Sequence, residues 1–223
     1  MKAEFLQRRG SQDFVYNTPN NLPGGNFILQ DTRDDRYNAF QLNLRRSFRE
    51  RYMVIVSYAR SSTHSNQVLN FNVDAPILGR VLPGTSTIVS PQAPGPFLWD
   101  APNRLLSWGF VPFFRLPIIH DLDLAYSIEA RTGFPFNVFT DQQLLFGLPG
   151  SHRFPTYFTL NLHLEKRFHL FGYYWALRGG FDDITGRSNP VVVNADVNSP
   201  QFLRFSGSNG RAFTSRIRFL GRK

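Results

Sequence analysis

Three features are missing from this sequence, and each absence excludes something. The 223 residues contain no cysteine, which fits either a reducing compartment or a cell-envelope protein without disulfides. No run of about 18 apolar residues occurs, so no helix is expected to span a membrane, although barrel strands carry a much weaker hydropathy signal. Residues 1–9 lack the apolar segment of a signal peptide and look like a strand already in progress. We therefore expect a chain that is truncated at its start.

Catalytic motifs are missing too. The sequence has no Gly-x-Ser-x-Gly, no cysteine nucleophile and no pair of histidines at the helical spacing of a metal site. We expect neither an enzyme nor a bound cofactor.

The net charge of +9 would suggest nucleic acid if the basic residues gathered on one element. They are instead scattered over the ends and the polar faces of the expected strands. A nucleic-acid partner is therefore not expected.

The sequence does contain regular alternation of apolar and polar residues. Its 23 Phe against 2 Met, with 15 Pro and 17 Gly, favour strands and turns over helices. The clearest alternation lies in residues 156–168 and 173–181, which a short turn at residues 169–172 connects. A period of two predicts antiparallel strands with one apolar and one polar face.

Six further segments show strand patterns: residues 1–9, 26–48, 51–60, 104–114, 121–131 and 202–219, the last interrupted at 206–210. In residues 104–114 the expected apolar row is Leu106, Trp108, Phe110 and Phe114, with Pro112 in the same row. The fold expected is therefore all-β, an antiparallel meander of about eight strands.

The expected connections alternate strictly between short turns and long loops. The long ones cover residues 10–25, 61–103, 132–155 and 185–201, and the second holds six prolines. Short turns on one side and long loops on the other are typical of a transmembrane barrel. A soluble sandwich, in which a second sheet covers the apolar faces, is the alternative.

Aromatic residues recur on the apolar faces next to the short turns: Phe48, Tyr52, Phe114, Phe168, Tyr173 and Phe219. Such residues would form an aromatic belt at a membrane interface. Arg46 and Lys166 lie on the same faces, each two residues before a Phe, where long basic side chains can reach headgroups. Ordinary aromatic residues at strand ends are the simpler interpretation.

Three polar sets deserve consideration as sites. Asn161, His163, Glu165 and Arg167 share a face, which could hold a metal or a proton relay, but a hydrated wall with partners on neighbouring strands is favoured.

The second set, His120, Asp121 and Asp123, follows a short turn and is expected to be solvated. In the third, Asn194, Asp196 and Asn198 alternate as calcium ligands can, but no glycine and no downstream glutamate complete a loop. No residue of the three sets is thus predicted to be catalytic, metal-binding or cofactor-binding.

Four segments resemble the C-terminal barrel of Oar-like TonB-dependent transporters. Residues 210–219 (GRAFTSRIRF) are similar to the closing strand of outer-membrane barrels, which ends on Phe, and residues 179–186 (GGFDDITG) to the end of the strand before it. Residues 126–136 (YSIEARTGFPF) and 158–168 (FTLNLHLEKRF) complete the set.

The resemblance implies a barrel of about 22 strands in the cell outer membrane, filled by a plug domain and energised by the TonB system. Residues 1–223 would be one partial barrel domain, the C-terminal part of a transporter for an unidentified solute, without plug or signal peptide. Its partners would be outer-membrane lipid, the rest of the barrel and the plug. The alternative function is a small free-standing eight-stranded barrel with a structural or adhesion role.

A row of charged residues is expected to face the lumen of such a barrel: Arg45, Glu129, Arg131, Arg167, Arg178, Asp182, Arg216 and Arg218. Taken together they would form a mainly positive wall that favours anionic solutes. Taken singly, they are expected to pair with one another across strands.

Overall fold

The computed structural model describes residues 1–17, 28–48, 52–67, 94–112, 122–141, 146–208 and 210–222. These residues form an all-β chain. Among them there is no helix with the length and apolar character needed to cross a membrane.

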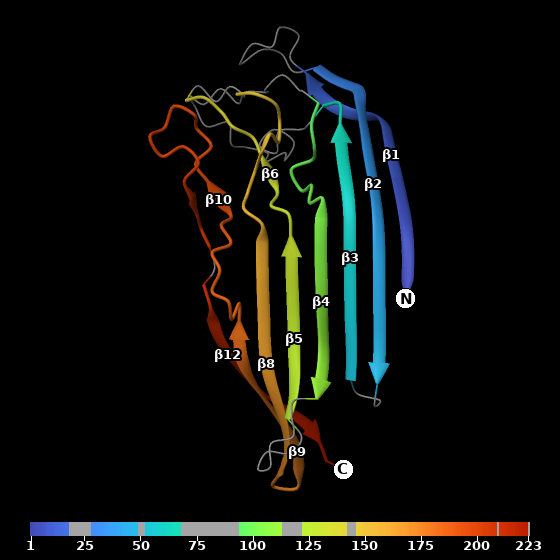
Figure 1. The fold of residues 1–223 in the computed structure, drawn as a ribbon, viewed down its shortest axis with the longest axis vertical. Coiled ribbons are helices and arrows are strands. Elements are labelled where there is room, and N and C mark those ends of the chain that lie inside the picture. The colour runs from blue at the N-terminus through green and yellow to red at the C-terminus, as the bar shows by residue number, and fades with distance from the viewer. Residues whose placement is uncertain are drawn as a thin grey trace.

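Eight strands form one antiparallel sheet in the order β1-β2-β3-β4-β5-β8-β9-β12, as Figure 1 shows. Their bounds are β1 Lys2–Asn17, β2 Ile28–Phe48, β3 Tyr52–Ser65, β4 Asn103–Pro112, β5 Leu122–Arg131, β8 Tyr157–Leu170, β9 Tyr173–Asp182 and β12 Ala212–Gly221. Each strand pairs with the next main strand along the chain, so the expected meander of eight strands is confirmed. The sheet is open, because β1 and β12 do not pair with each other.

The strand ends that the short connections join, β2 to β3, β4 to β5 and β8 to β9, lie at one end of the sheet, at the bottom of Figure 1. The strand ends that the long connections join lie at the opposite end, as the alternation predicted. Between β8 and β9 only Phe171 and Gly172 form the turn, and both have positive φ, 54° and 78°. Two successive positive φ values define a type I′ turn, whose twist matches that of the strands it joins.

Several expected boundaries are wrong. Strand β1 runs to Asn17 and β3 to Ser65, so each takes up the start of an expected loop. The expected strand from residue 202 is two elements: β11 (Phe205–Ser206) pairs with β10 (Val192–Val193) outside the main sheet, and β12 begins only at Ala212.

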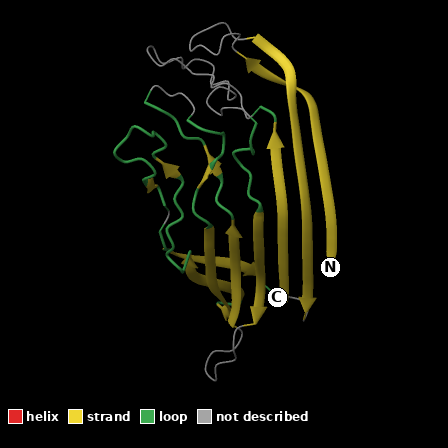
Figure 2. Ribbon diagram, turned by 45° about the horizontal axis from the view of Figure 1, so that its top comes forward, coloured by secondary structure: helices red, strands yellow, loops and turns green. Residues whose placement is uncertain are grey.

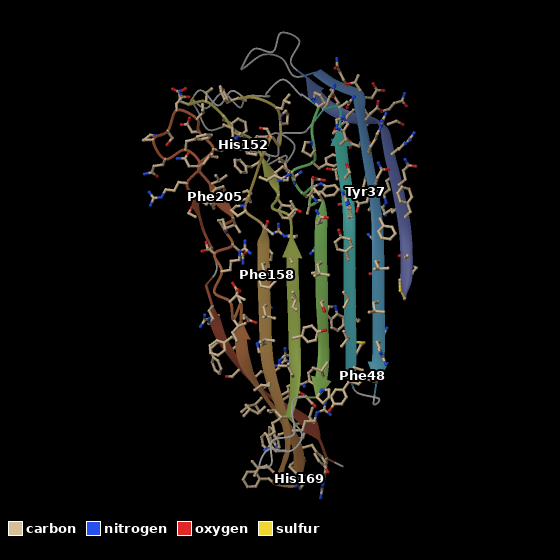
Figure 3. All side chains as sticks on the ribbon, viewed as in Figure 1. Tyr37, Phe48, His152, Phe158, His169 and Phe205 are labelled. Atoms are coloured by element: carbon tan, nitrogen blue, oxygen red, sulfur yellow. The ribbon has the colours of Figure 1, made fainter. Side chains whose placement is uncertain are left out.

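The long connections contain structure of their own near the top of Figure 1. In addition to the β10–β11 pair, β6 (Pro135–Phe136) pairs with β7 (His152–Arg153). Phe136 is buried, and its ring lies 5.2 Å from that of Phe154 and 6.2 Å from that of Phe205. Aromatic packing therefore joins the two small hairpins, which the labelled His152 and Phe205 locate in Figure 3.

The strand register assigns every side chain of the sheet to one of two faces. We call the face that carries Glu165 the inner face and the face that carries Phe40 the outer face. Asp123, Glu165 and Arg178 stand in one row across β5, β8 and β9, on the inner face. Phe5 and Phe40 are paired on the outer face.

The expected apolar row of β4 is on the other face from the one predicted. Leu106, Trp108 and Phe110 pair with Glu129, Ser127 and Ala125, so they lie on the inner face with the polar residues of β5. They adjoin Ile55 and Met53 of β3 and make an apolar patch there. Phe114 lies outside the described residues.

The sheet twists and curls along its width. In Figure 2 some strands run across the direction of the long N-terminal strands, and Figure 1 identifies β9 and β12 as the strands that tilt away from β2 and β3. A strong right-handed twist is expected for a sheet with this many strands. The curl brings together inner-face side chains that are two strands apart.

Candidate functional site

Burial in this sheet is inverted relative to a soluble protein. Charged and polar residues of the inner face are buried, among them Asp123 at 1% exposure and Glu165 at 0%. Large apolar residues of the outer face are exposed, including Phe40, Leu44, Leu164, Phe213, Ile217 and Phe219. The inner face of β5, β8, β9 and β12 is therefore where polar chemistry is concentrated.

Glu165 is the centre of this polar face. Nη2 of Arg218 donates to both of its carboxylate oxygens, at 2.7 and 2.6 Å, and Nε of Arg167 lies 3.8 Å from Oε1. Arg218 belongs to β12 and Glu165 to β8, so the pair bridges over β9. Ala176, which stands opposite both Arg167 and Arg218, leaves the space for this contact and is itself fully buried.

A second bridge over β9 lies beside the first. Nε2 of His163 is 2.9 Å from Oγ1 of Thr214 and 3.5 Å from Oδ1 of Asp182. Gly180 of β9 is the register partner of both His163 and Thr214. Because it has no side chain, nothing on β9 separates these two residues. His163, Glu165 and Arg167 therefore have partners on neighbouring strands, as the wall interpretation predicted. Asn161, on the same strand, accepts the backbone N–H of Asp183 through its side-chain oxygen at 2.8 Å.

Asp123 is not the solvated residue that its position after a turn predicted. It is almost fully buried, and the hydroxyl of Tyr52 donates to its Oδ1 at 3.0 Å. A carboxylate taken from water needs such donors. His120 and Asp121 of the same set lie outside the described residues.

The aromatic belt also loses one member, because Tyr52 is 7% exposed and uses its hydroxyl on this contact. Tyr173 and Phe219 are exposed and lie together, with ring centroids 5.3 Å apart.

The side-chain oxygens of Asn194, Asp196 and Asn198 each accept a hydrogen bond from a backbone N–H. Asn194 Oδ1 accepts the backbone N–H of Asp196, and Asp196 Oδ1 accepts that of Asn198, as in Asx turns. Asn198 Oδ1 accepts the backbone N–H of Asp141, which ties this loop to the segment after β6. Among the described residues no group of three or more His, Asp or Glu side chains could hold a metal ion.

The expected charged row does lie on one face. Some members are paired: Glu129 lies 3.1 Å from Arg104 and 3.6 Å from Arg131. The Arg131 guanidinium also stands over the rings of Phe134 and Tyr157, at 3.8 and 4.3 Å, which is cation–π distance.

Arg178 and Arg216 are an uncompensated pair in this wall. They stand directly opposite each other on β9 and β12, and in the described part of the chain neither has an ion-pair partner. Glu165 is the register partner of Arg178, but Arg218 occupies both of its oxygens. With His163, Thr214 and Ser215 the two arginines line a polar pocket. Like charges directly opposite are destabilising, so this pocket favours anions.

Replacing Arg216 with glutamate should stabilise the sheet. The change turns the repulsive pair with Arg178 into an attractive one, which we expect to add about 0.5–1 kcal/mol to the free energy of unfolding. The midpoint of urea unfolding, followed by tryptophan fluorescence, measures this. Arg216→Gln removes only the repulsion and should give a smaller gain; a lower midpoint for Arg216→Glu would contradict the assignment.

Sequence reasoning missed a second polar and aromatic cluster, formed where residues 94–100 fold back on the sheet. Asp100 is buried, accepts from the Thr63 hydroxyl at 2.8 Å and pairs with Arg153 at 2.5 Å. Close by in the chain, the rings of Phe97 and Trp99 stack at 5.1 Å. Two aromatic residues two positions apart in a proline-rich loop, Phe97 and Trp99, were the available signal, because loops carry binding residues.

Neither a protein-family model nor a curated protein matches this sequence. The described geometry brings together no nucleophile with a base and an orienting third group, which is the arrangement that covalent catalysis needs. What the arrangement can do is bind and orient polar or charged solutes along the inner face.

Proposed function

We propose that this chain is part of the wall of a transmembrane β-barrel in the cell outer membrane. One observation carries the proposal: the sheet exposes large apolar residues of its outer face, while Asp123, His163 and Glu165 of its inner face are buried. A face with Phe40, Leu44, Leu177, Phe213 and Ile217 all exposed is costly in water, at about 25 cal/mol for each Å² of apolar surface. Lipid removes that cost, and a hydrated lumen suits the other face.

The extent of the apolar surface supports the same proposal. On β2 the outward residues Phe40, Leu42, Leu44 and Phe48 are apolar, with Arg46 beside Phe48. The outward residues beyond Phe40 are polar: Asn38, Arg36, Asp34 and Thr32. The apolar part, residues 40–48, is close to the about 9–11 residues that a tilted strand needs to cross a bilayer. On β3 the same change falls after Tyr58, at Arg60, whose register partner is Phe40.

The open edges favour a larger barrel over a small one. An eight-stranded barrel requires β1 to pair with β12, whereas within the described residues β1 pairs only with β2 and β12 only with β9. Unpaired strand edges are costly in hydrocarbon, which favours a wall that further strands complete. This supports the C-terminal part of a TonB-dependent transporter, with a plug inside and an unidentified solute. The free-standing eight-stranded barrel with a structural or adhesion role is the second candidate.

Membrane insertion is tested with three single-cysteine variants, because the chain has no cysteine of its own. Leu44→Cys lies in the apolar outer band, Asn43→Cys is its inner-face neighbour, and Arg36→Cys lies on the outer face above the band. Each is labelled with an environment-sensitive maleimide in membranes isolated from producing cells. Brominated lipid should quench the Leu44→Cys label severalfold more than the other two.

Two results would count against this function. A chain that stays in the soluble fraction has no need for lipid and would favour a sandwich. Equal quenching at the three positions would show that the two faces do not meet different solvents.

A further inference from the structure

A pocket near the long-loop end of the sheet has features of a ligand site outside the charged wall. It lies where β1 and β2 meet the folded-back segment of residues 94–100, near the labelled Tyr37 of Figure 3. Its volume is about 570 Å³, within the range of small-molecule sites. From the geometry of this pocket we infer that it binds a neutral saccharide, stacked on Trp99.

Aromatic rings form one wall. The indole of Trp99 stacks on Phe97 with an interplanar angle of 7°, and the Tyr37 ring lies 6.1 Å from it. Phe97 thus supports Trp99 from one side, yet Trp99 remains 58% exposed. A supported but exposed indole is a rigid surface for the apolar C–H face of a sugar ring.

Two carboxylates, Asp13 and Asp35, also line the pocket, and the backbone conformation places the first of them. The β1–β2 register shifts between Gly10 and Asp13, where Gln12 has φ of 59°. Such a bulge re-aims the side chains that follow it. A Cβ on Gly10 would lie 2.5 Å from Oδ2 of Asp13, so the carboxylate occupies the space that glycine leaves.

The second carboxylate, that of Asp35, has one oxygen that accepts no hydrogen bond from the described residues. Arg33 holds Oδ2 of Asp35 with two N–H groups, at 2.9 and 2.6 Å. The other carboxylate oxygen of Asp35, Oδ1, is buried and has no hydrogen-bond partner among the described residues. A buried acceptor without a donor is costly, and a ligand hydroxyl would satisfy it.

This mixture of groups selects the ligand class. Asp13 and Asp35 only accept hydrogen bonds, the three lining arginines (Arg8, Arg9 and Arg36) only donate, and Gln41 does both. The hydroxyls of a polyol can donate to the two carboxylates and accept from the arginine and glutamine side chains. Because these arginines line the pocket, its charge does not exclude an anion. The Asp13 carboxylate and Oδ1 of Asp35, which has no partner among the described residues, call for hydrogen-bond donors, which hydroxyls supply and a fully ionised phosphate or polycarboxylate does not.

This inference rests on the proposed function in one respect. If the chain is part of a transporter, saccharide binding identifies the class of its solute. The binding test itself does not depend on membrane insertion. The whole chain is purified from whichever cell fraction holds it, in lauryldimethylamine oxide if detergent is required, because glycoside detergents would occupy the site. Maltotriose, cellotriose, xylotriose and mannotriose are titrated by calorimetry up to about 10 mM, the weak end of specific binding.

At least one trisaccharide should bind saturably. Trp99→Ala should weaken it by about tenfold or more, and Asp13→Ala by about threefold to tenfold, because a stacking surface and a hydrogen-bond acceptor are lost. Trp108→Ala is the matched control: Trp108 is 47% exposed, does not line the pocket, and should change affinity less than about twofold.

Three outcomes would overturn the inference: no saturable binding of any trisaccharide, equal binding by Trp99→Ala and the unaltered chain, or tighter binding of inorganic pyrophosphate than of any saccharide. Saccharide binding by a chain that stays soluble would keep this inference and reject the outer-membrane proposal. Membrane insertion without saccharide binding would do the reverse.

Discussion

Replacing Arg218 with alanine should destabilise the sheet by about 2–4 kcal/mol, because the change leaves a charged carboxylate buried without its main partner. Glu165 is fully buried, and Arg218 supplies both of its short contacts. The guanidinium of Arg167 remains, but its Nε is 3.8 Å from the carboxylate and that side chain is 42% exposed. Urea unfolding followed by tryptophan fluorescence should show a clearly lower midpoint.

The opposite half of the pair gives the control. Glu165→Gln leaves Arg218 without a charged partner, but the amide oxygen can still accept a hydrogen bond, and the Arg218 side chain is 40% exposed, so water can solvate it. We expect a loss of only about 1 kcal/mol for this variant. If both variants unfold at the same urea concentration, the burial of Glu165 does not determine the energetics of this pair.

Replacing Gly180 with alanine should disrupt the pairing of β8 with β9. A Cβ there would lie 2.1 Å from the carbonyl oxygen of Leu162 and 2.5 Å from Cα of His163, and both are backbone atoms that cannot rotate away. The strands would have to separate, at a cost of about 3 kcal/mol or more. The added methyl group would also stand between His163 and Thr214. We expect a lower urea midpoint and a reduced yield of folded chain.

The neighbouring glycine is the matched control for this prediction. A Cβ on Gly179 would meet only the end of the Phe213 ring, at 3.7 Å, which is ordinary van der Waals contact. Gly179→Ala should therefore change stability by less than about 0.5 kcal/mol. Similar losses for the two variants would attribute the effect to strand propensity and not to the close approach of β8.

The strands whose alternation the sequence displays most clearly were predicted well. In β8 the residues Leu160, Leu162 and Leu164 alternate with Asn161, His163 and Glu165, and the two rows do lie on opposite faces. A period of two is a local property, so sequence alone reveals it.

Where both rows of side chains on a strand are partly apolar, the sequence does not show which row lies on the outer face of the sheet. In β4, Leu106, Trp108 and Phe110 look like an outward row, yet pairing with β3 and β5 turns them inward. The outward row is Leu105, Ser107, Gly109 and Val111, and the Tyr126 ring covers the space above Gly109. Register depends on the partners of a strand, and a shift by one residue exchanges its faces.

Contacts between distant parts of the chain were out of reach for the same reason. Tyr52 and Asp123 are 71 positions apart, and nothing in the turn that precedes Asp123 indicates a donor. Trp99 and Asp13 come together only because a loop folds onto the first two strands. The strand pattern therefore predicted the sheet and the charged row, but not the pocket.

If the sheet is part of a barrel wall, as proposed, the length of β2 determines how far from the bilayer this pocket lies. The strand has 21 residues, about 70 Å at 3.3 Å per residue, whereas the hydrocarbon core is about 30 Å thick. If the apolar part of the strand occupies the core, most of residues 28–38 rise above the headgroups and carry Asp35 and Tyr37 of the pocket with them. A polymer anchored outside the cell could then reach Trp99 by one of its ends without first entering the barrel, so chain length of the saccharide need not limit capture.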